Sequence, residues 1–218
     1  MKINRAYVLL VFFIPGVVLA DWSKLPSREF SVPDYPAEGS AAYKRDYDTL
    51  LQLQSTRSEM DCALARKQRF PFFAALFGES AGIFSEPEIT ALTPLFTKVT
   101  KLSDRITDYF KHKFERPRPF AVDRRIVPCA DKPEGALSYP SSHTAIAAAD
   151  ACVLAELFPL RAKKILDYGN YLGDLRAIVG VHHPSDVEAG KALGKSICAH
   201  LLADEEFQLE LKEIKKGL

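Results

Sequence analysis

The longest helical pattern in this 218-residue sequence lies near its middle and restricts the fold more than any other feature. Ser85-Glu86-Pro87-Glu88 combines a capping serine, a proline near the first helical position and two acids, which is typical of a helix start. Apolar residues then recur at spacings of three and four as far as Phe110. The prolines at 117 and 119 must end this helix, because the residue before a proline avoids helical geometry. One helix of about 25 residues is therefore predicted.

Other segments show the same helical spacing or helix-start signals. They cover residues 40–54, 58–69, 141–157, 160–178, 182–202 and 204–216. The stretch 121–137 has no clear period and is predicted to be a long loop, and we find no internal repeat and no strand alternation. The predicted fold class is therefore all-α, a single compact helical bundle domain. The proline-rich residues 21–39 are predicted to form an extended arm on its surface.

Residues 1–20 have the pattern of a signal peptide. Lys2 and Arg5 precede an apolar stretch from Ala6 to Leu19, and Val18-Leu19-Ala20 fits the small-residue pattern before a cleavage site. The alternative is an uncleaved anchor, but the apolar run is shorter than the roughly 20 residues that a spanning helix needs. We predict cleavage after Ala20. The mature domain, residues 21–218, would be periplasmic or secreted, with no stable membrane insertion.

Composition limits the partners of the chain. The formal net charge of +1 gives no bulk attraction for polyanions, and no basic run is interleaved with aromatic residues, so no nucleic acid is expected. The four cysteines show no CxxC spacing, which argues against a zinc site. An even count in an exported chain indicates disulfides, with three connectivities open. The apolar helices and the N-terminal arm are compatible with a homodimer.

The segment 138–144, Ser-Tyr-Pro-Ser-Ser-His-Thr, leads into an alanine-rich helix. Ser141 or Ser142 is a natural N-cap, and the backbone N–H groups of a helix start attract anions. His143, in the first turn, could move a proton near neutral pH. The alternative is that the serines only cap a core helix and that His143 packs locally.

Three cations and one His–Asp pair also stand out. Lys111 lies late in the long helix and Arg118 lies between two prolines, where the alternatives are a solvated helix end and an ordinary loop arginine. Arg176 lies in an apolar run, and a buried arginine usually has a partner. His182 and Asp186 are four residues apart at a helix start, so the carboxylate can reach the ring and fix its tautomer. Alternatively, Asp186 only caps its own helix.

In combination, these residues resemble the three-part signature of the type-2 phosphatidic acid phosphatase superfamily. The parts are Lys111 with six residues before Arg118-Pro119, then Pro140-Ser141-Ser142-His143, then Arg176 with five residues before His182 and three more before Asp186. The flanking residues 134–140, Glu-Gly-Ala-Leu-Ser-Tyr-Pro, look most like the class A non-specific acid phosphatases, which are exported bacterial enzymes of about this length. The resemblance covers roughly residues 78–193.

The resemblance implies an exported acid phosphatase that hydrolyses small-molecule phosphate monoesters through a phosphohistidine, without a metal or other cofactor. His182 would attack phosphorus, Asp186 would orient and stabilise its ring, and His143 would protonate the leaving oxygen and then activate water. The implied phosphate-binding residues are Lys111, Arg118, Ser141, Ser142 and Arg176. Three other functions remain open: a vanadium-dependent haloperoxidase, a soluble lipid or polyprenyl diphosphate phosphatase, and a non-catalytic phosphate-binding protein.

Three positions depart from the family pattern. Ser142 replaces the usual glycine, and we expect strain or crowding of the phosphate there. Leu175 replaces the usual serine before Arg176, and the loss of one hydrogen bond to a charged group would weaken the transition state by about 1.5–3 kcal/mol. His183 takes a position often held by tryptophan, where we expect it at the pocket rim.

The resemblance also implies a disulfide pairing. If the helices that begin near His143 and Asp186 leave one pocket side by side, Cys152 and Cys198 lie about 14 and 18 Å along them. These depths favour Cys152–Cys198, with Cys62–Cys129 as the second bridge.

Overall fold

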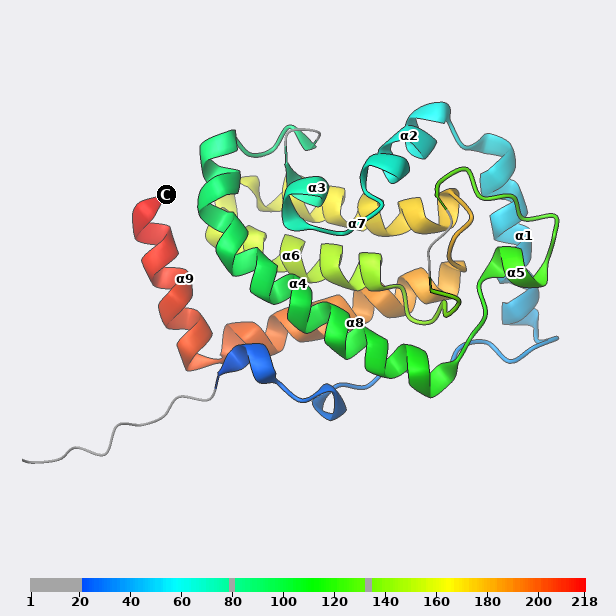
Figure 1. Cartoon of the computed structure of the whole chain (residues 1–218), viewed down its shortest axis with the longest axis horizontal. Coiled ribbons are helices and arrows are strands. Elements are labelled where there is room, and N and C mark those ends of the chain that lie inside the picture. Colours follow the sequence, from blue (N-terminus) through cyan, green and yellow to red (C-terminus); the bar gives the residue numbers. More distant parts are fainter. Residues whose placement is uncertain (1–20, 79–80, 132–134) are drawn as a thin grey trace, which may run out of the picture.

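The computed structural model describes residues 21–78, 81–131 and 135–218, and the predicted signal peptide lies outside them. The regular structure of these residues is helical throughout, with an isolated bridge between Pro117 and Leu137 and no strand (Figure 1). The predicted all-α class is confirmed. None of the described helices is long and apolar enough to cross a membrane.

The predicted helices are present, with small shifts at their ends. The long helix α4 spans Glu86–Phe114 and is 29 residues long, and Glu115 ends it in a left-handed conformation with φ of 48°. Two short helices, α3 (Phe73–Phe77) and α5 (Pro119–Val122), were not predicted as separate elements. The other α-helices are α1 (Ala41–Thr56), α2 (Glu59–Lys67), α6 (Ser142–Leu157), α7 (Ala162–Ile178), α8 (Pro184–Ala203) and α9 (Glu205–Gly217).

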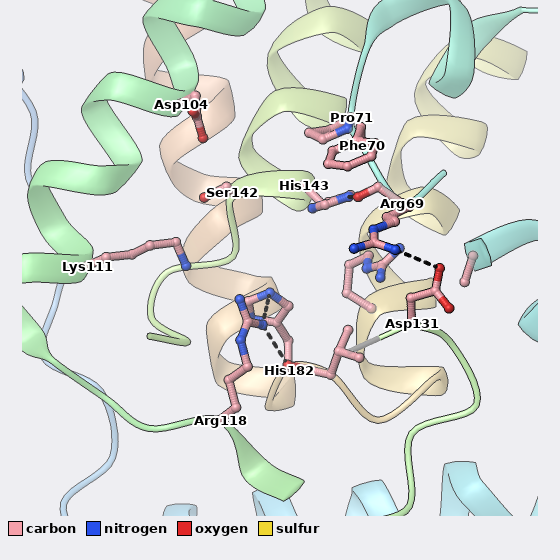
Figure 2. Close-up of a pocket in the computed structure, with 13 residues that line it drawn as sticks. Arg69, Phe70, Pro71, Asp104, Lys111, Arg118, Asp131, Ser142, His143 and His182 are labelled. Atoms are coloured by element: carbon pink, nitrogen blue, oxygen red, sulfur yellow. Dashed lines mark hydrogen bonds and ion pairs between the residues drawn. The ribbon is translucent and has the colours of Figure 1, made fainter. Parts of the chain in front are cut away.

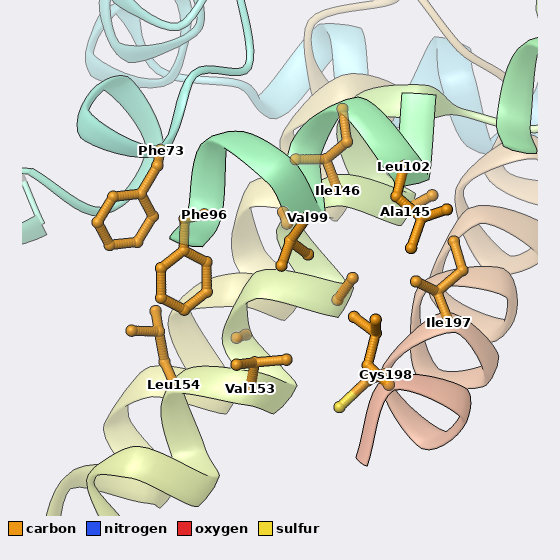
Figure 3. Close-up of a cluster of buried hydrophobic side chains, with 14 of the residues drawn as sticks. Phe73, Phe96, Val99, Leu102, Ala145, Ile146, Val153, Leu154, Ile197 and Cys198 are labelled. Atoms are coloured by element: carbon orange, nitrogen blue, oxygen red, sulfur yellow. The ribbon is translucent and has the colours of Figure 1, made fainter. Parts of the chain in front are cut away.

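Helix α6 is the centre of the bundle and packs against α4, α7 and α8. Its alanines leave room for these neighbours, and most of its residues are buried whichever way they point. On the α8 side, a Cβ added to Gly194 would lie 2.3 Å from the backbone oxygen of Ala145. Small residues therefore set the distance between α6 and α8. Figure 3 shows the apolar side chains that α4 and α8 bring onto α6.

Both predicted disulfides are present. Cys152–Cys198 joins α6 to α8, with a Cα–Cα distance of 6.1 Å, and Cys62–Cys129 joins α2 to the segment after α5, with a distance of 5.5 Å. The first bridge fastens the two helices whose N-termini meet at one end of the bundle. There the N–H of Ser141 donates to the backbone oxygen of Asp186 over 3.1 Å.

The predicted N-terminal arm runs along the outside of the helices and is anchored by apolar contacts. It contains two short 3₁₀ turns, Trp22–Lys24 and Ser27–Glu29, and is otherwise extended. Trp22 is buried edge-on against Phe207 of α9, with ring centroids 5.0 Å apart, and its indole N–H donates to Glu210. The arm therefore fastens α9 to the body of the bundle.

Candidate active site

A polar cavity of about 210 Å³ opens where α4, α6 and α7 approach the turn before α8. Figure 2 shows side chains from these distant segments directed into the same space. Of the eight residues predicted for the site, six line this cavity: Lys111, Arg118, Ser142, His143, Arg176 and His182. Ser141 and Asp186, the other two, are buried directly behind it.

The start of α6 divides its polar groups between the protein and the cavity. Ser141 is the N-cap, and its hydroxyl accepts hydrogen bonds from the N–H and the hydroxyl of Thr144. Its own N–H is committed to Asp186, whereas Ser142 lines the cavity. Ser142 is therefore better placed than Ser141 to meet a bound anion at this helix start.

The hydrogen bonds of His182 define its tautomer. Its Nε2 lies 3.0 Å from Nη1 of Arg118, and because arginine can only donate, Nε2 must accept. The ring proton is then on Nδ1, which lies 3.4 Å from Oδ2 of Asp186 and 3.4 Å from the hydroxyl of Ser138. Burial, followed by the charge of Arg118, holds the pKa of His182 well below its usual value. Nε2 therefore carries no proton, and its lone pair accepts the hydrogen bond from Arg118 at the wall of the cavity.

Asp186 is fully buried, yet it remains ionised. Burial alone would raise its pKa, but hydrogen bonds with His182 and His183 and the charge of Arg116 outweigh that effect and hold the pKa well below its usual value. Its Oδ2 accepts from the backbone N–H of His183 over 2.8 Å and from the hydroxyl of Ser138. A buried carboxylate thus stands behind the ring of His182.

The three cations concentrate positive charge on the cavity. Burial, followed by the charge of Arg118, lowers the pKa of Lys111 to about 8, and burial lowers the pKa values of Arg118 and Arg176 to about 10. Lys111 donates to the backbone oxygens of Leu137 and Pro140. Arg176 is only 4% exposed, and its Nε and Nη1 have no hydrogen-bond partner within the described part of the chain. A phosphate group in the cavity would satisfy these donors.

His143 faces the segment that leads into α3. Its Nε2 lies 3.0 Å from the backbone oxygen of Gln68 and 3.1 Å from that of Arg69, so Nε2 carries a proton and Nδ1 is the second nitrogen. Burial, followed by the charge of Arg176, lowers the pKa of His143 to about 3. The ring is therefore neutral while the cavity holds no anion, and a bound phosphate would raise its pKa by offsetting the cations.

The structure changes the interpretation of the three departures. Ser142 begins a helix with ordinary geometry, since Glu115 is the one non-glycine residue with positive φ in the described segments, so the expected strain is absent. Leu175 does not line the cavity but packs in a buried apolar cluster with Ala65 and Val181. His183 is not at the rim, because its ring turns inward between Asp186, 3.1 Å away, and the hydroxyl of Tyr47.

Two charged residues near the site were missed at the sequence level. Arg116 is only 2% exposed and donates to Asp186 over 2.7 Å and to Asp46 of α1 over 2.9 Å. Its position between Glu115 and Pro117 resembles an ordinary solvated loop, and Asp46 lies among other charged residues in α1. The helical spacing of α1, which places Asp46 beside buried Tyr47 and Leu50, was the one available signal.

Comparison with known proteins gives one matching family and several similar acid phosphatases. The family model of the PAP2 superfamily matches residues 89–208. A non-specific acid phosphatase of Providencia stuartii is 34% identical over 195 residues, which cover 84% of this chain and 77% of the relative. An acid phosphatase of Zymomonas mobilis is 30% identical, covering 84% and 72%, and a non-specific acid phosphatase of Salmonella typhimurium is 28% identical, covering 96% and 91%.

A solved structure shares the fold at lower identity. It is described as the first bacterial vanadium-dependent iodoperoxidase, with a TM-score of 0.62 and 17% identity. The match covers 84% of this chain but only 56% of the iodoperoxidase chain, and at this identity it shows a shared fold alone. The family model and the acid phosphatase relatives together show that this chain belongs to the PAP2 superfamily.

Proposed function

We propose that this chain is an exported acid phosphatase that hydrolyses small phosphate monoesters through a phosphohistidine on His182. The observation that carries the proposal is the unprotonated Nε2 of His182, which accepts from the cavity residue Arg118 while Nδ1 faces a buried carboxylate. The relatives that match most of the chain are named acid phosphatases, which supports the same reaction class.

In the first step, the phosphate group lies among Lys111, Arg118 and Arg176, which neutralise its charge. Arg118 shifts its Nη1 hydrogen bond from Nε2 of His182 to a phosphate oxygen, and the released Nε2 lone pair forms a bond to phosphorus as the bond to the ester oxygen breaks. The leaving oxygen takes a proton from His143, whose pKa the bound dianion has raised. Nδ1 is the nitrogen that carries this proton, because Nε2 is held by two backbone oxygens.

In the second step, water replaces the leaving group. His143 accepts a proton from the water as its oxygen bonds to phosphorus, and the N–P bond breaks with its electrons returning to Nε2 of His182. The phosphorylated ring is cationic, with its proton on Nδ1, and the charge of Asp186 stabilises it. Charge neutralisation comes from the three side-chain cations, so the proposed reaction requires no metal ion.

Replacement of His182 tests the mechanism. His182→Ala should reduce hydrolysis of an aryl phosphate to background, and a rapid quench into base should trap labelled phosphohistidine in the wild type only. His112→Ala is the matched control, because His112 is exposed on α4 and pairs with Asp108. EDTA should leave the rate unchanged. A variant that retains activity without His182, or activity that EDTA removes, would exclude this mechanism.

Assays with a panel of substrates distinguish the proposed function from the three alternatives. Hydrolysis of soluble monoesters with vanadate as an inhibitor supports the proposal, whereas iodide oxidation with vanadate and peroxide would indicate a haloperoxidase. Preference for dispersed lipid phosphates would indicate a lipid phosphatase, and phosphate binding without turnover would indicate a binding protein. The homodimer remains a prediction, which gel filtration with light scattering would check.

Two disulfides and the bacterial acid phosphatase relatives are consistent with an exported protein. We place the mature chain, residues 21–218, in the periplasm or outside the cell. Intact mass measurement of the protein released by osmotic shock should give a first residue of Asp21. A protein that retains residues 1–20 in the membrane fraction would contradict this proposal.

A further inference from the structure

Two carboxylates share one buried guanidinium behind the proposed nucleophile. Arg116 donates through Nη1 to Oδ1 of Asp186 over 2.7 Å and through Nη2 to Oδ2 of Asp46 over 2.9 Å. All three side chains are at least nine-tenths buried. Neither Arg116 nor Asp46 lines the cavity, so both reach the reaction only through Asp186.

The arrangement fixes the orientation of the Asp186 carboxylate. Arg116 holds Oδ1, and this leaves Oδ2 directed at His182, His183 and Ser138. The guanidinium of Arg116 is shared by the carboxylates of Asp186 and Asp46. Two negative charges therefore surround one positive charge. The buried group therefore keeps a net negative charge next to the ring of His182.

Asp46 is tied to the start of α8 as well as to Arg116. Its Oδ1 accepts from the backbone N–H of Ser185 over 3.0 Å, and its Oδ2 accepts from the hydroxyl of Ser185. Ser185 also receives a hydrogen bond from Nη1 of Arg116 over 2.7 Å. A carboxylate from α1 thus helps to fix the helix turn that presents Asp186, although α1 lies outside the residues that the family model matches.

We infer that Asp46 is a positioning residue for the phosphatase reaction: through Arg116 and Ser185 it holds Asp186 in register and preserves the negative charge behind His182. This inference rests on the proposed function, in which His182 becomes phosphorylated. Without Asp46, the full charge of Arg116 would fall on Asp186 and draw its negative charge away from Nδ1 of His182.

The test combines one variant that removes a charge with one that keeps the charge and changes only its geometry. Asp46→Asn keeps the shape and removes the charge, while Arg116→Lys keeps the charge but lacks the fork that reaches two acids. Each should lower kcat about 10- to 100-fold, as loss of an outer partner of a functional histidine typically does. KM should stay within about threefold, because the phosphate-binding cations are unchanged. The double variant should be no worse than either single one, because the residues act as a unit.

Controls separate positioning from folding. Rates are divided by the fraction of folded molecules, measured from the circular dichroism unfolding curve of each variant, so a loss of folded protein alone does not lower the corrected kcat. Glu88→Gln removes another ion pair, with Arg161 at 2.8 Å, and should lower Tm while leaving the corrected kcat unchanged. His182→Ala is assayed in parallel.

Each outcome decides between the proposals. A corrected kcat for Asp46→Asn within twofold of the wild type, with His182→Ala inactive, would overturn the positioning role and leave the phosphatase mechanism intact. Additive losses in the double variant would also overturn it. Activity in His182→Ala would overturn the mechanism and the inference together. If Asp46→Asn does not fold, Arg116→Lys alone decides by the same corrected kcat and KM.

Discussion

Arg176 offers the sharpest test of the site, because it carries a charge that the folded protein stabilises poorly. Burial lowers its pKa from 12.5 to about 10, which corresponds to about 3 kcal/mol against the charged form in the folded state. Arginine is charged in both the folded and unfolded states near pH 7, so this cost is present in full there. The ligand-free protein therefore keeps Arg176 at the expense of its own stability.

Replacing Arg176 with methionine should reverse that cost. Arg176→Met removes a buried charge that lies near Arg118, and we expect the free energy of unfolding of the ligand-free protein to rise by about 1–3 kcal/mol, after the cost of the space that the smaller side chain leaves. For a chain of this length, about 2 kcal/mol corresponds to a rise in Tm of roughly 4–8 °C. Activity on an aryl phosphate should fall to background, because one of the three phosphate-binding cations is lost.

Thermal unfolding followed by circular dichroism, with and without inorganic phosphate, measures both effects. Phosphate should raise the Tm of the wild type in proportion to the logarithm of its concentration, and it should not raise that of Arg176→Met. Arg118→Met is the matched control: Arg118 has a similarly lowered pKa but donates to Gly135 and Val181, so its removal should lower Tm. A ligand-free Arg176→Met that melts at or below the wild-type temperature would refute the reasoning.

Other parts of the structure give further expected outcomes. Burial lowers the pKa of Lys111 to about 8, so Lys111 should lose its proton above that pH and kcat/KM should fall there. Lys111→Arg should extend activity to higher pH, and identical pH profiles of the two proteins would contradict this expectation. Gly194→Ala should lower the free energy of unfolding in urea by about 1–3 kcal/mol, because its Cβ would overlap the backbone of Ala145. A variant as stable as the wild type would show that α6 and α8 can move apart without loss of stability. The double replacement Cys152→Ser and Cys198→Ser should lower the free energy of unfolding by about 4 kcal/mol, because the bridge closes a loop of 46 residues in the unfolded chain. An unchanged unfolding midpoint would argue against the bridge.

Local structure followed closely from the sequence. Capping serines, first-turn acids and helical spacing depend on residues a few positions apart, so they predicted the main helices to within a few residues. The same local signals placed His143 and Asp186 in the first turns of α6 and α8. The four-residue spacing from His182 to Asp186 was enough to anticipate that the carboxylate lies near the ring.

The surroundings of the site were decided by packing between distant segments. Asp46 and Arg116 are 70 positions apart in sequence and meet only because α1 lies against the start of α8. His183 was expected at the pocket rim. Its ring is instead buried between Asp186 and Tyr47, and hydrogen bonds to both side chains hold it there. No local pattern predicts such contacts, because each depends on where another helix passes.

The sequence by itself determined an all-α chain and the residue types needed to bind phosphate and to move a proton. Only the tertiary structure decided which charges are paired: Arg116 is enclosed by two carboxylates, whereas Arg176 keeps two nitrogens without a partner among the described residues. The physical reason is burial. A charge removed from water must find its partner in three dimensions, and the arginine that lacks one lies where we propose that the anion binds.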